Sequence, residues 1–352
     1  MREKGQPVHW LAKQPLRLTF IMLVVALAPF LCADVFAQET KAKEKKNRAE
    51  WMEGQWGFRF NMPSMKHPDK LADFDVKRMI NQIKVLDTAK WVQINITQGA
   101  NGSFFTSPHG KLAKYVSPDI VPRRDLFGEV LDALIAEDFK IHVYFATEGP
   151  TMGKHPDKAL PGVIEKWKKY AKSLEMTPEQ AVAEIIVKEY SLRYGKKISG
   201  WWFDHAGYGD IKLLARAART GNPQAALAFN MGATPKLLTC PESDFTAGHP
   251  TPMKQQLPSW KGNEVAIELI EKNNYIKGSL GHFFPPLQAK WNSGKPAFKT
   301  EQAVDWTTKI VEAGGAITWA VALVDKKTSL LAPAQFEQLR AINEAVKKMR
   351  RN

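Results

Sequence analysis

An aspartate follows a run of aromatic residues near the middle of this 352-residue chain. Trp201, Trp202 and Phe203 suit a buried strand, and Asp204 stands where that strand would end. In an α/β barrel, side chains at the carboxyl ends of the strands converge on one face and carry the chemistry. A carboxylate among aromatic rings at such a strand end suits a site that meets a sugar. The alternative is that Asp204 only satisfies loop amides.

Chemistry on a sugar at Asp204 would need a second group nearby that can transfer a proton. Glu242 is the first candidate for this acid, because it lies on the loop after an expected strand over residues 225–230. Asp244 follows closely, and His249 is a third candidate because imidazole titrates near neutrality. Residues 241–244 are also typical of a polar turn.

Other polar or aromatic side chains near expected strand ends are candidates for binding a sugar. The candidates are Trp202, Asn61, Gln98, Asn101, Asn230 and His282. Each of the amide and imidazole side chains could instead hold a loop in place. Glu148 also follows an expected strand, and Asp210 is expected to cap the next helix.

These residues are positioned by a pattern of apolar strands alternating with amphipathic helices. Strands are expected over residues 56–61, 91–96, 140–146, 200–203, 225–230, 246–249, 278–284 and 316–323. Helices are expected over 73–86, from 125, from 177 to Gly195, and over 211–219, 264–272, 301–312 and 333–348. This alternation predicts a single (β/α)8 TIM-like barrel. An open doubly wound sheet is the alternative, but no glycine-rich phosphate fingerprint follows the first strand.

The amino terminus has the composition of an export signal. Basic residues precede an apolar run over residues 18–32, and Val35-Phe36-Ala37 resembles a cleavage site. We therefore expect a signal peptide over residues 1–37, a basic linker over 38–49 and a barrel over 50–352, exported to the periplasm or the extracellular space. An uncleaved anchor is the alternative. Cys240 alone would remain after cleavage, so no intramolecular disulfide is expected.

The chain is strongly basic, with a formal net charge of +14. Its first 37 residues hold four basic and two acidic residues, so their removal would leave +12. This charge attracts polyanions, and in an exported protein the fitting partner is an acidic or sulfated polysaccharide or an anionic envelope surface. A solvated charged surface without a specific partner is the alternative. No nucleic-acid motif, metal-ligand spacing or serine-nucleophile motif is present, so no metal or cofactor is expected.

Four stretches of the sequence resemble the α-L-fucosidase family of retaining glycoside hydrolases. They are residues 50–58, residues 89–92 with 104–109, Trp202-Phe203-Asp204, and residues 279–282 with 313–316. The resemblance spans about residues 50–348 and implies a barrel in which Asp204 is the nucleophile. The chain departs from the family's pattern after the first two strands, where Arg59-Phe60-Asn61 and residues 96–102 replace histidine-containing motifs. It also has no carboxylate near Gly248, where the family's acid/base would fall.

Three functions follow from these observations. The first is an exported glycoside hydrolase that resembles α-L-fucosidases and acts with retention on a fucoside-like or related sugar of a polysaccharide. The second is a catalytically degenerate barrel that binds acidic or sulfated glycans. The third is an enzyme of another kind on the same barrel, because one fold supports many chemistries.

Overall fold

A computed structural model describes residues 47–98, 104–151, 156–231, 240–248, 279–324 and 329–351 of the chain. The expected signal peptide, most of the basic linker and the expected helix over 264–272 lie outside these residues. Within the described ranges, no helix has the length and apolar character needed to cross a bilayer.

Seven parallel strands form one curled sheet in the order β5-β4-β3-β2-β1-β9-β6. Their bounds are Gln55–Phe60 (β1), Trp91–Asn95 (β2), Lys140–Ala146 (β3), Ile198–Asp204 (β4), Ala226–Phe229 (β5), His282–Phe283 (β6) and Ala316–Val321 (β9). A separate antiparallel hairpin consists of β7 (Gln288–Lys290) and β8 (Ser293–Pro296). The expected parallel α/β, TIM-like architecture is thus confirmed, and the seven strands of the sheet agree with expected ones within a few residues. The expected strand over 246–249 is not among them, because the chain there forms only an isolated bridge at Phe245, and the β7–β8 hairpin was not expected.

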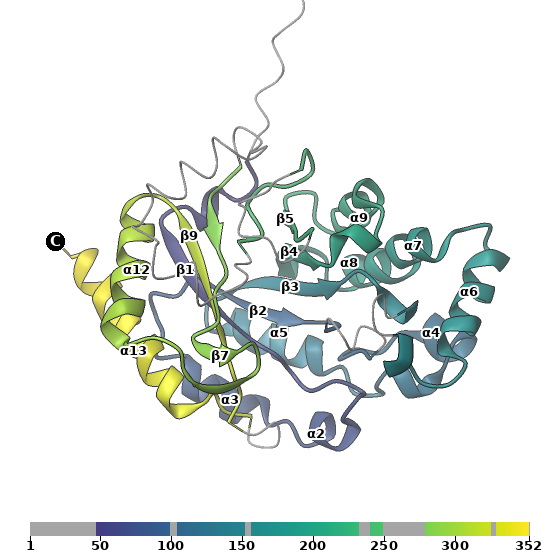
Figure 1. Ribbon diagram of the computed structural model, residues 1–352, viewed down its shortest axis with the longest axis horizontal. Helices are drawn as coiled ribbons and strands as arrows, with labels where there is room; N and C mark the ends of the chain where they lie inside the picture. Colours follow the sequence, from purple (N-terminus) through teal and green to yellow (C-terminus); the bar gives the residue numbers. More distant parts are fainter. Residues whose placement is uncertain are drawn as a thin grey trace, which may run out of the picture. The chain divides into compact units, whose positions relative to one another are not determined.

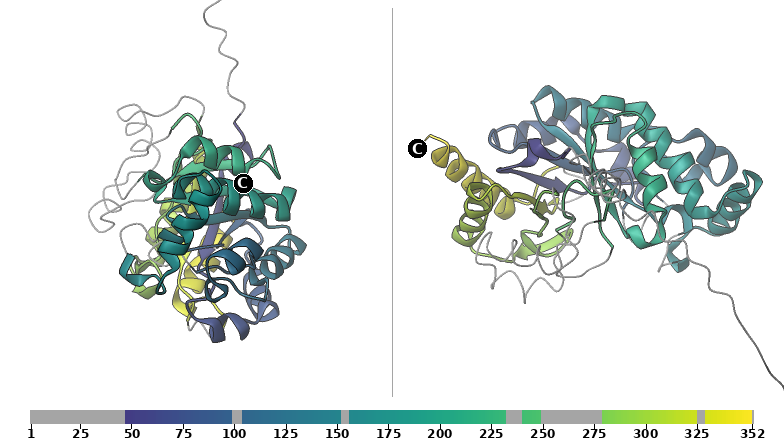
Figure 2. Two further views of the ribbon diagram at one scale, coloured as in Figure 1. Left: turned by 90° about the vertical axis from the view of Figure 1, so that its right-hand side faces the viewer. Right: turned by 90° about the horizontal axis from the view of Figure 1, so that it is seen from above.

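Helices alternate with these strands along the chain. The α-helices are Pro68–Ala72 (α2), Val76–Ile83 (α3), Gly110–Tyr115 (α4), Leu126–Ala136 (α5), Val163–Ser173 (α6), Pro178–Ala181 (α7), Lys188–Tyr194 (α8), Ile211–Ala218 (α9), Thr300–Glu312 (α12) and Pro333–Met349 (α13). Shorter 3-10 or π turns are η1 (Glu50–Met52), η3 (Pro118–Ile120), η4 (Gly149–Thr151), η5 (Pro156–Lys158), η6 (Val182–Val187), η7 (Gly195–Lys197) and η8 (Ala206–Tyr208). Helices α12 and α13 lie side by side beyond β1 and β9 (Figure 1). Helices α6 to α9 lie at the other end of the row of strands (Figure 2).

Several helices begin at the capping residues that the sequence indicates. Asp210 accepts a hydrogen bond from Leu213 N at 3.0 Å, as expected for the cap of α9. Thr177 and Gln180 form a reciprocal capping box at the start of α7. Gly195 ends α8 with φ of +50°, a conformation that favours glycine.

Strand alternation divides the apolar residues into two cores. The first core lies between the strands and the helices and includes Trp201 and Phe203 of β4. The second lies on the opposite, concave face of the sheet and includes Trp91, Tyr144 and Trp202. Because side chains alternate along a strand, Asp204 shares the concave face with Trp202.

Glycines make room for the large rings on the concave face. A Cβ atom on Gly57 would lie 2.5 Å from the Trp91 indole, and one on Gly200 would lie 2.5 Å from the His142 ring. These two positions therefore accept no larger residue without displacement of a buried ring.

Residues 244–248 lie between the two edge strands of the sheet. Asp244 N donates to Leu227 O of β5 at 2.8 Å, and Leu280 N donates to Asp244 O at 2.8 Å. Phe245 forms a parallel bridge with Leu280, and Phe284 N donates to Gly248 O at 2.8 Å. This segment therefore connects β5 with the strand region around β6 by backbone hydrogen bonds.

Candidate active site

Asp204 is the last residue of β4, and its carboxylate lies in a network of polar side chains. Asn230, which follows β5 directly, donates from Nδ2 to Asp204 Oδ1 at 2.7 Å. The same oxygen accepts from His205 N at 3.0 Å, and the Tyr144 hydroxyl donates to Oδ2. The residue is 8% exposed, so the carboxylate is held in a fixed orientation with only a small part open to solvent. The structure thus brings together two of the sequence-predicted residues, Asp204 and Asn230.

Aromatic rings and an arginine surround the buried side of this carboxylate. The Tyr144 ring stacks on Trp202 with centroids 5.4 Å apart, and the Arg59 guanidinium lies 4.2 Å from the Tyr144 centroid. Burial, and then the charge of Asp204, raise the pKa of Tyr144 well above its ordinary value. Tyr144 therefore remains a hydroxyl donor to Asp204. Burial lowers the pKa of Arg59, but the neighbouring Asp204 carboxylate opposes that shift and favours the cationic form of the guanidinium.

A histidine and a glutamate lie on the other side of Asp204. The ring Nδ1 of His205 contacts a carboxylate oxygen of Glu148, and its Nε2 lies 3.7 Å from Asp204 Oδ2. The Glu148 side chain is only 2% exposed, whereas that of His205 is 35% exposed. His205 adopts a left-handed backbone conformation with φ of +53°, which turns the chain sharply after β4. The imidazole therefore joins a buried carboxylate to the nucleophile candidate.

Asn61 and Gln98 lie at the same end of the sheet but not against Asp204. Both line a small pocket of about 20 Å³ with Met62, Asn292, Val321 and Leu323. Asn61 contacts Arg59 and Asn292 through its side-chain amide. These two predicted residues thus lie near the carboxyl ends of β1 and β2, where they connect the site to the β7–β8 hairpin.

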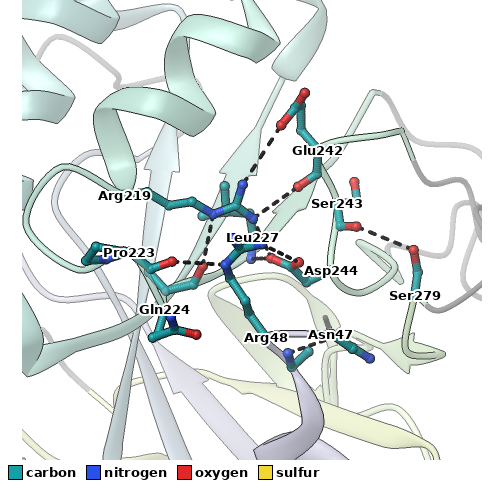
Figure 3. A network of polar contacts seen from close by, with 12 residues as sticks. Asn47, Arg48, Arg219, Pro223, Gln224, Leu227, Glu242, Ser243, Asp244 and Ser279 are labelled. Carbon is teal, nitrogen blue, oxygen red and sulfur yellow. Dashed lines mark hydrogen bonds and ion pairs between the residues drawn. The ribbon is translucent and has the colours of Figure 1, made fainter. Parts of the chain in front are cut away.

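Glu242 and Asp244 lie at the opposite end of the strands from Asp204. Asp244 Oδ2 accepts from Leu227 N at 2.9 Å and from Arg219 Nη2 at 2.7 Å, and Glu242 Oε2 lies 3.9 Å from Arg219 Nη1 (Figure 3). Arg219 is the C-cap of α9, where the chain approaches the start of β5. Leu227 precedes Asn230 by three residues, which corresponds to about 10 Å along a strand. The structure therefore corrects the interpretation of these carboxylates. They form ion pairs with Arg219 at the amino-terminal end of β5, away from Asp204.

Trp202 and His282 are fully buried, so neither presents a surface to a sugar in this structure. Trp202 Nε1 donates to Ala247 O at 2.9 Å. Thr318 Oγ1 accepts from Trp91 Nε1 at 2.9 Å and lies 2.7 Å from His282 Nε2. His282 Nδ1 lies 3.0 Å from Thr246 O, so a neutral imidazole with its proton on Nδ1 satisfies both contacts. These two candidates are thus supporting residues of the concave core.

The remaining candidates, His249 and Asn101, lie outside the described residues. The chain leading to His249 is described as far as Gly248, which lies beside Phe284, and Ala247 accepts the Trp202 hydrogen bond. Thus residues 244–248 run from the Arg219 end of the sheet towards the Asp204 end.

Sequence reasoning missed four residues that surround Asp204: Arg59, Tyr144, Glu148 as a site residue, and His205. Tyr144 occupies a strand position with the same inward direction as Trp202, a signal that alternation along residues 140–146 contains. Glu148 stands beyond the same strand, and its position at a strand end is the signal in the sequence. Within the described part of the chain, no group of three or more His, Cys, Asp or Glu residues is arranged to hold a metal ion.

The fold resembles that of solved endo-fucoidan hydrolases and α-L-fucosidases. A variant of the endo-fucoidan hydrolase MfFcnA4 from glycoside hydrolase family 107 matches with a TM-score of 0.75 and 22% identity, over 85% of this chain and 54% of that chain. The endo-fucoidan hydrolase P5AFcnA of the same family matches with a TM-score of 0.72 and 19% identity, over 85% of this chain and 93% of that one. The α-L-fucosidase AlfC from Lactobacillus casei, in complex with α-L-fucose, matches with a TM-score of 0.56 and 14% identity, over 87% of this chain and 99% of that chain. The fold-level resemblance to α-L-fucosidases is thus confirmed.

The family follows from the sequence match. The family model described as endo-alpha(1,4)-fucoidanase Mef1 matches residues 46–239 and 236–351. The chain therefore belongs to the Mef1 family. No curated protein sequence matches significantly. The chain spans only about half the length of the MfFcnA4 variant, 54% of that chain.

Proposed function

We propose that this protein is an endo-acting α-fucoidanase that hydrolyses a sulfated fucan with retention, with Asp204 as the nucleophile. The observation that carries the proposal is the Asp204 carboxylate at the strand end, oriented by Asn230 and Tyr144. Membership of the Mef1 family supports the substrate class. In the first step Asp204 attacks C1, the glycosidic C–O bond breaks, and a proton passes to the leaving oxygen. Water then cleaves the glycosyl-enzyme ester and returns a proton to the acid/base.

His249 is our choice for the acid/base. Glu242 and Asp244 are engaged with Arg219 at the far end of the sheet. His249 follows Gly248 in the segment that leads towards the Asp204 end, and an imidazole can deliver a proton near neutral pH. His205 is the second candidate because its Nε2 lies 3.7 Å from Asp204 Oδ2. However, its Nδ1 contact with Glu148 favours a role in holding Asp204.

We further propose that the sheet closes into an eight-stranded barrel, with residues 244–248 in the place of the missing strand. The backbone hydrogen bonds of this segment to Leu227 and Leu280 support closure. The barrel would then comprise residues 50–352, preceded by the basic linker and by a signal peptide that directs export. A sulfated polysaccharide outside the cell would suit both export and the basic charge.

The proposed function is tested by incubating the protein with a sulfated fucan and following the size distribution of the products. An endo-acting enzyme lowers the mean chain length early and releases little free fucose. The matched control is Asp204→Asn, which keeps the size of the side chain but removes the nucleophile, and it is expected to reduce turnover by more than about 10³-fold. Release of free fucose as the main early product would contradict endo action. Binding without any change in chain length would favour the degenerate sugar binder.

A further inference from the structure

The β7–β8 hairpin projects beyond the carboxyl ends of the strands, on the same side as Asp204. Pro286 forms a parallel bridge with Ala320 near the end of β9, and Ala322 N donates to Gln288 Oε1 at 3.2 Å. Asn292 in the turn contacts Asn61, which directly follows β1. The hairpin therefore reaches the rim of the site at the ends of β1 and β9.

The hairpin is held at several points by buried amide side chains. Gln288, which is 1% exposed, donates from Nε2 to Trp291 O at 3.0 Å, and Gln335 of α13 donates to Gly294 O at 2.8 Å. These bonds fix the turn from both sides, so the residues that it presents are preorganised. Preorganisation lowers the entropy cost of binding a ligand.

An aromatic path leads from the turn to the nucleophile candidate. Trp291, which is half-buried, has its ring centroid 5.4 Å from that of Phe284. Phe284 in turn packs edge-on against Trp202 at 4.9 Å, and Trp202 stacks with Tyr144, the donor to Asp204. The exposed part of Trp291 is thus separated from the reacting carboxylate by a short chain of packed rings.

Two exposed lysines, Lys290 and Lys295, accompany Trp291 on the hairpin. Residues 279–299 contain three lysines and no aspartate or glutamate. Among the described residues, no ion pair involves Lys290 or Lys295. Within the described part of the chain, the rim therefore presents two lysines without an ion-pair partner, next to an aromatic ring.

We propose that the β7–β8 hairpin binds a sulfate-bearing sugar unit adjacent to the one that is cleaved. Trp291 contacts the face of that sugar, and Lys290 and Lys295 bind its sulfate groups. This inference rests on the proposed function for its substrate. The lysines give selectivity for charge, whereas the indole contributes apolar contact that does not depend on sulfation.

The experiment compares Lys290→Gln/Lys295→Gln with Trp291→Ala on a sulfated fucan and on the same polymer after chemical desulfation. The lysine variant is expected to raise KM for the sulfated polymer about tenfold, to leave KM for the desulfated polymer unchanged, and to weaken the salt dependence of KM. Trp291→Ala is expected to raise KM for both polymers by about 3- to 10-fold. The control, Lys166→Gln/Lys168→Gln, removes two exposed lysines of α6.

Binding is also measured by calorimetry with the sulfated polymer in the Asp204→Asn background, so that turnover is not needed. Loss of affinity in the Lys290→Gln/Lys295→Gln variant, but not in the α6 control, supports the proposal. Equal affinities in these two variants, or equal losses on sulfated and desulfated polymers, would overturn it. If the unmodified protein binds but never cleaves the polymer, the proposed function fails while the hairpin proposal is still decided by these affinities.

Discussion

Asn230 donates a hydrogen bond from Nδ2 to Oδ1 of Asp204 at 2.7 Å, across the ends of the neighbouring strands β5 and β4. Both residues are buried, with exposed fractions of 4% and 8%. A hydrogen bond to a buried carboxylate stabilises its ionised form and fixes which lone pairs face the substrate. The amide therefore orients the carboxylate that we propose as the nucleophile.

Asn230→Ala is expected to reduce kcat/KM by about 10- to 100-fold, because a hydrogen bond to a charged group is worth roughly 1.5–3 kcal/mol. Asn230→Asp should reduce kcat/KM further at neutral pH, because two adjacent carboxylates cannot both ionise easily. Steady-state kinetics on the polymer from pH 5 to 8 measure both effects. Kinetics equal to wild type for Asn230→Ala would show that the amide does not assist Asp204.

The contact of Glu148 with His205 predicts that both residues support the position of Asp204. The Glu148 carboxylate contacts Nδ1 of His205, and Nε2 of the same ring lies 3.7 Å from Asp204 Oδ2. Glu148→Gln weakens the contact that orients the imidazole, so kcat should fall by about tenfold while KM changes little. Steady-state kinetics on the polymer measure this separation of kcat from KM.

His205→Gln should lower kcat by a similar factor, and the double variant should be no worse than His205→Gln alone, because the two residues act as a unit. Asp210→Asn, which changes only the cap of α9, is the control and should keep the wild-type kinetics. Recovery of the wild-type kcat in Glu148→Asp would support a positioning role. Wild-type kcat in both single variants would refute the coupling.

Trp202 should contribute to stability rather than to sugar binding. It is fully buried, and its indole donates to Ala247 O at 2.9 Å. Trp202→Ala is therefore expected to lower the free energy of unfolding by about 3–5 kcal/mol. Trp202→Phe should lower the free energy of unfolding by a smaller amount, because it loses the hydrogen bond but keeps an aromatic ring. Its effect on KM should be small. Urea denaturation and KM for the two variants decide between these roles, and a KM increase with unchanged stability would restore Trp202 as a contact residue.

The sequence predicts the position of Asp204 and Asn230 because both directly follow apolar strands, and strand ends in parallel α/β folds share one edge. It also predicts most helices, since capping residues such as Asp210 and Thr177 mark where each begins. The sequence could not predict how deeply each side chain is buried within the concave face. Trp202 and Asp204 point the same way, but Trp202 lies one layer lower and is covered by Tyr144 and Phe284.

The placement of Glu242 and Asp244 depends on the segment that follows them. Their position after the expected strand over residues 225–230 predicts the loop at the carboxyl end of that strand. Both residues also stand at the start of the next parallel segment, and the start of a parallel strand lies at the opposite end of the sheet. The backbone bonds of Asp244 to Leu227 and Leu280 show that pairing begins at Asp244, so both carboxylates lie at the Arg219 end. The Arg219 partner, 25 residues earlier in the chain, could not be inferred from spacing.

His282 predicts a pH dependence of stability. Burial lowers the pKa of this imidazole to about 4, against about 6.5 in the unfolded chain. Between these pH values the unfolded state binds more protons than the folded state. The contribution of His282 to the free energy of unfolding is therefore fully present above pH 6.5 and decreases as the pH falls towards 4. The contribution lost is about 3 kcal/mol.

Urea unfolding of wild type and His282→Gln at pH 7.5 and pH 4.5 isolates this contribution. The wild type should lose about 2–3 kcal/mol more than the variant on acidification, because only the wild type must keep this imidazole neutral. His142, whose pKa is also lowered by burial, is present in both proteins. An identical acid loss in the two proteins would mean that His282 does not control this dependence.

The central claim is that Asp204 forms the covalent bond to the sugar, and azide rescue tests it most directly. Asp204→Gly removes the carboxylate and leaves space at the anomeric carbon, so hydrolysis of an activated aryl glycoside of a sulfated fuco-oligosaccharide should fall by more than about 10³-fold. Sodium azide should then restore cleavage and give a glycosyl azide of inverted configuration, because the azide attacks from the face that Asp204 occupied. Undiminished hydrolysis by Asp204→Gly, or an azide product of retained configuration, would contradict the assignment.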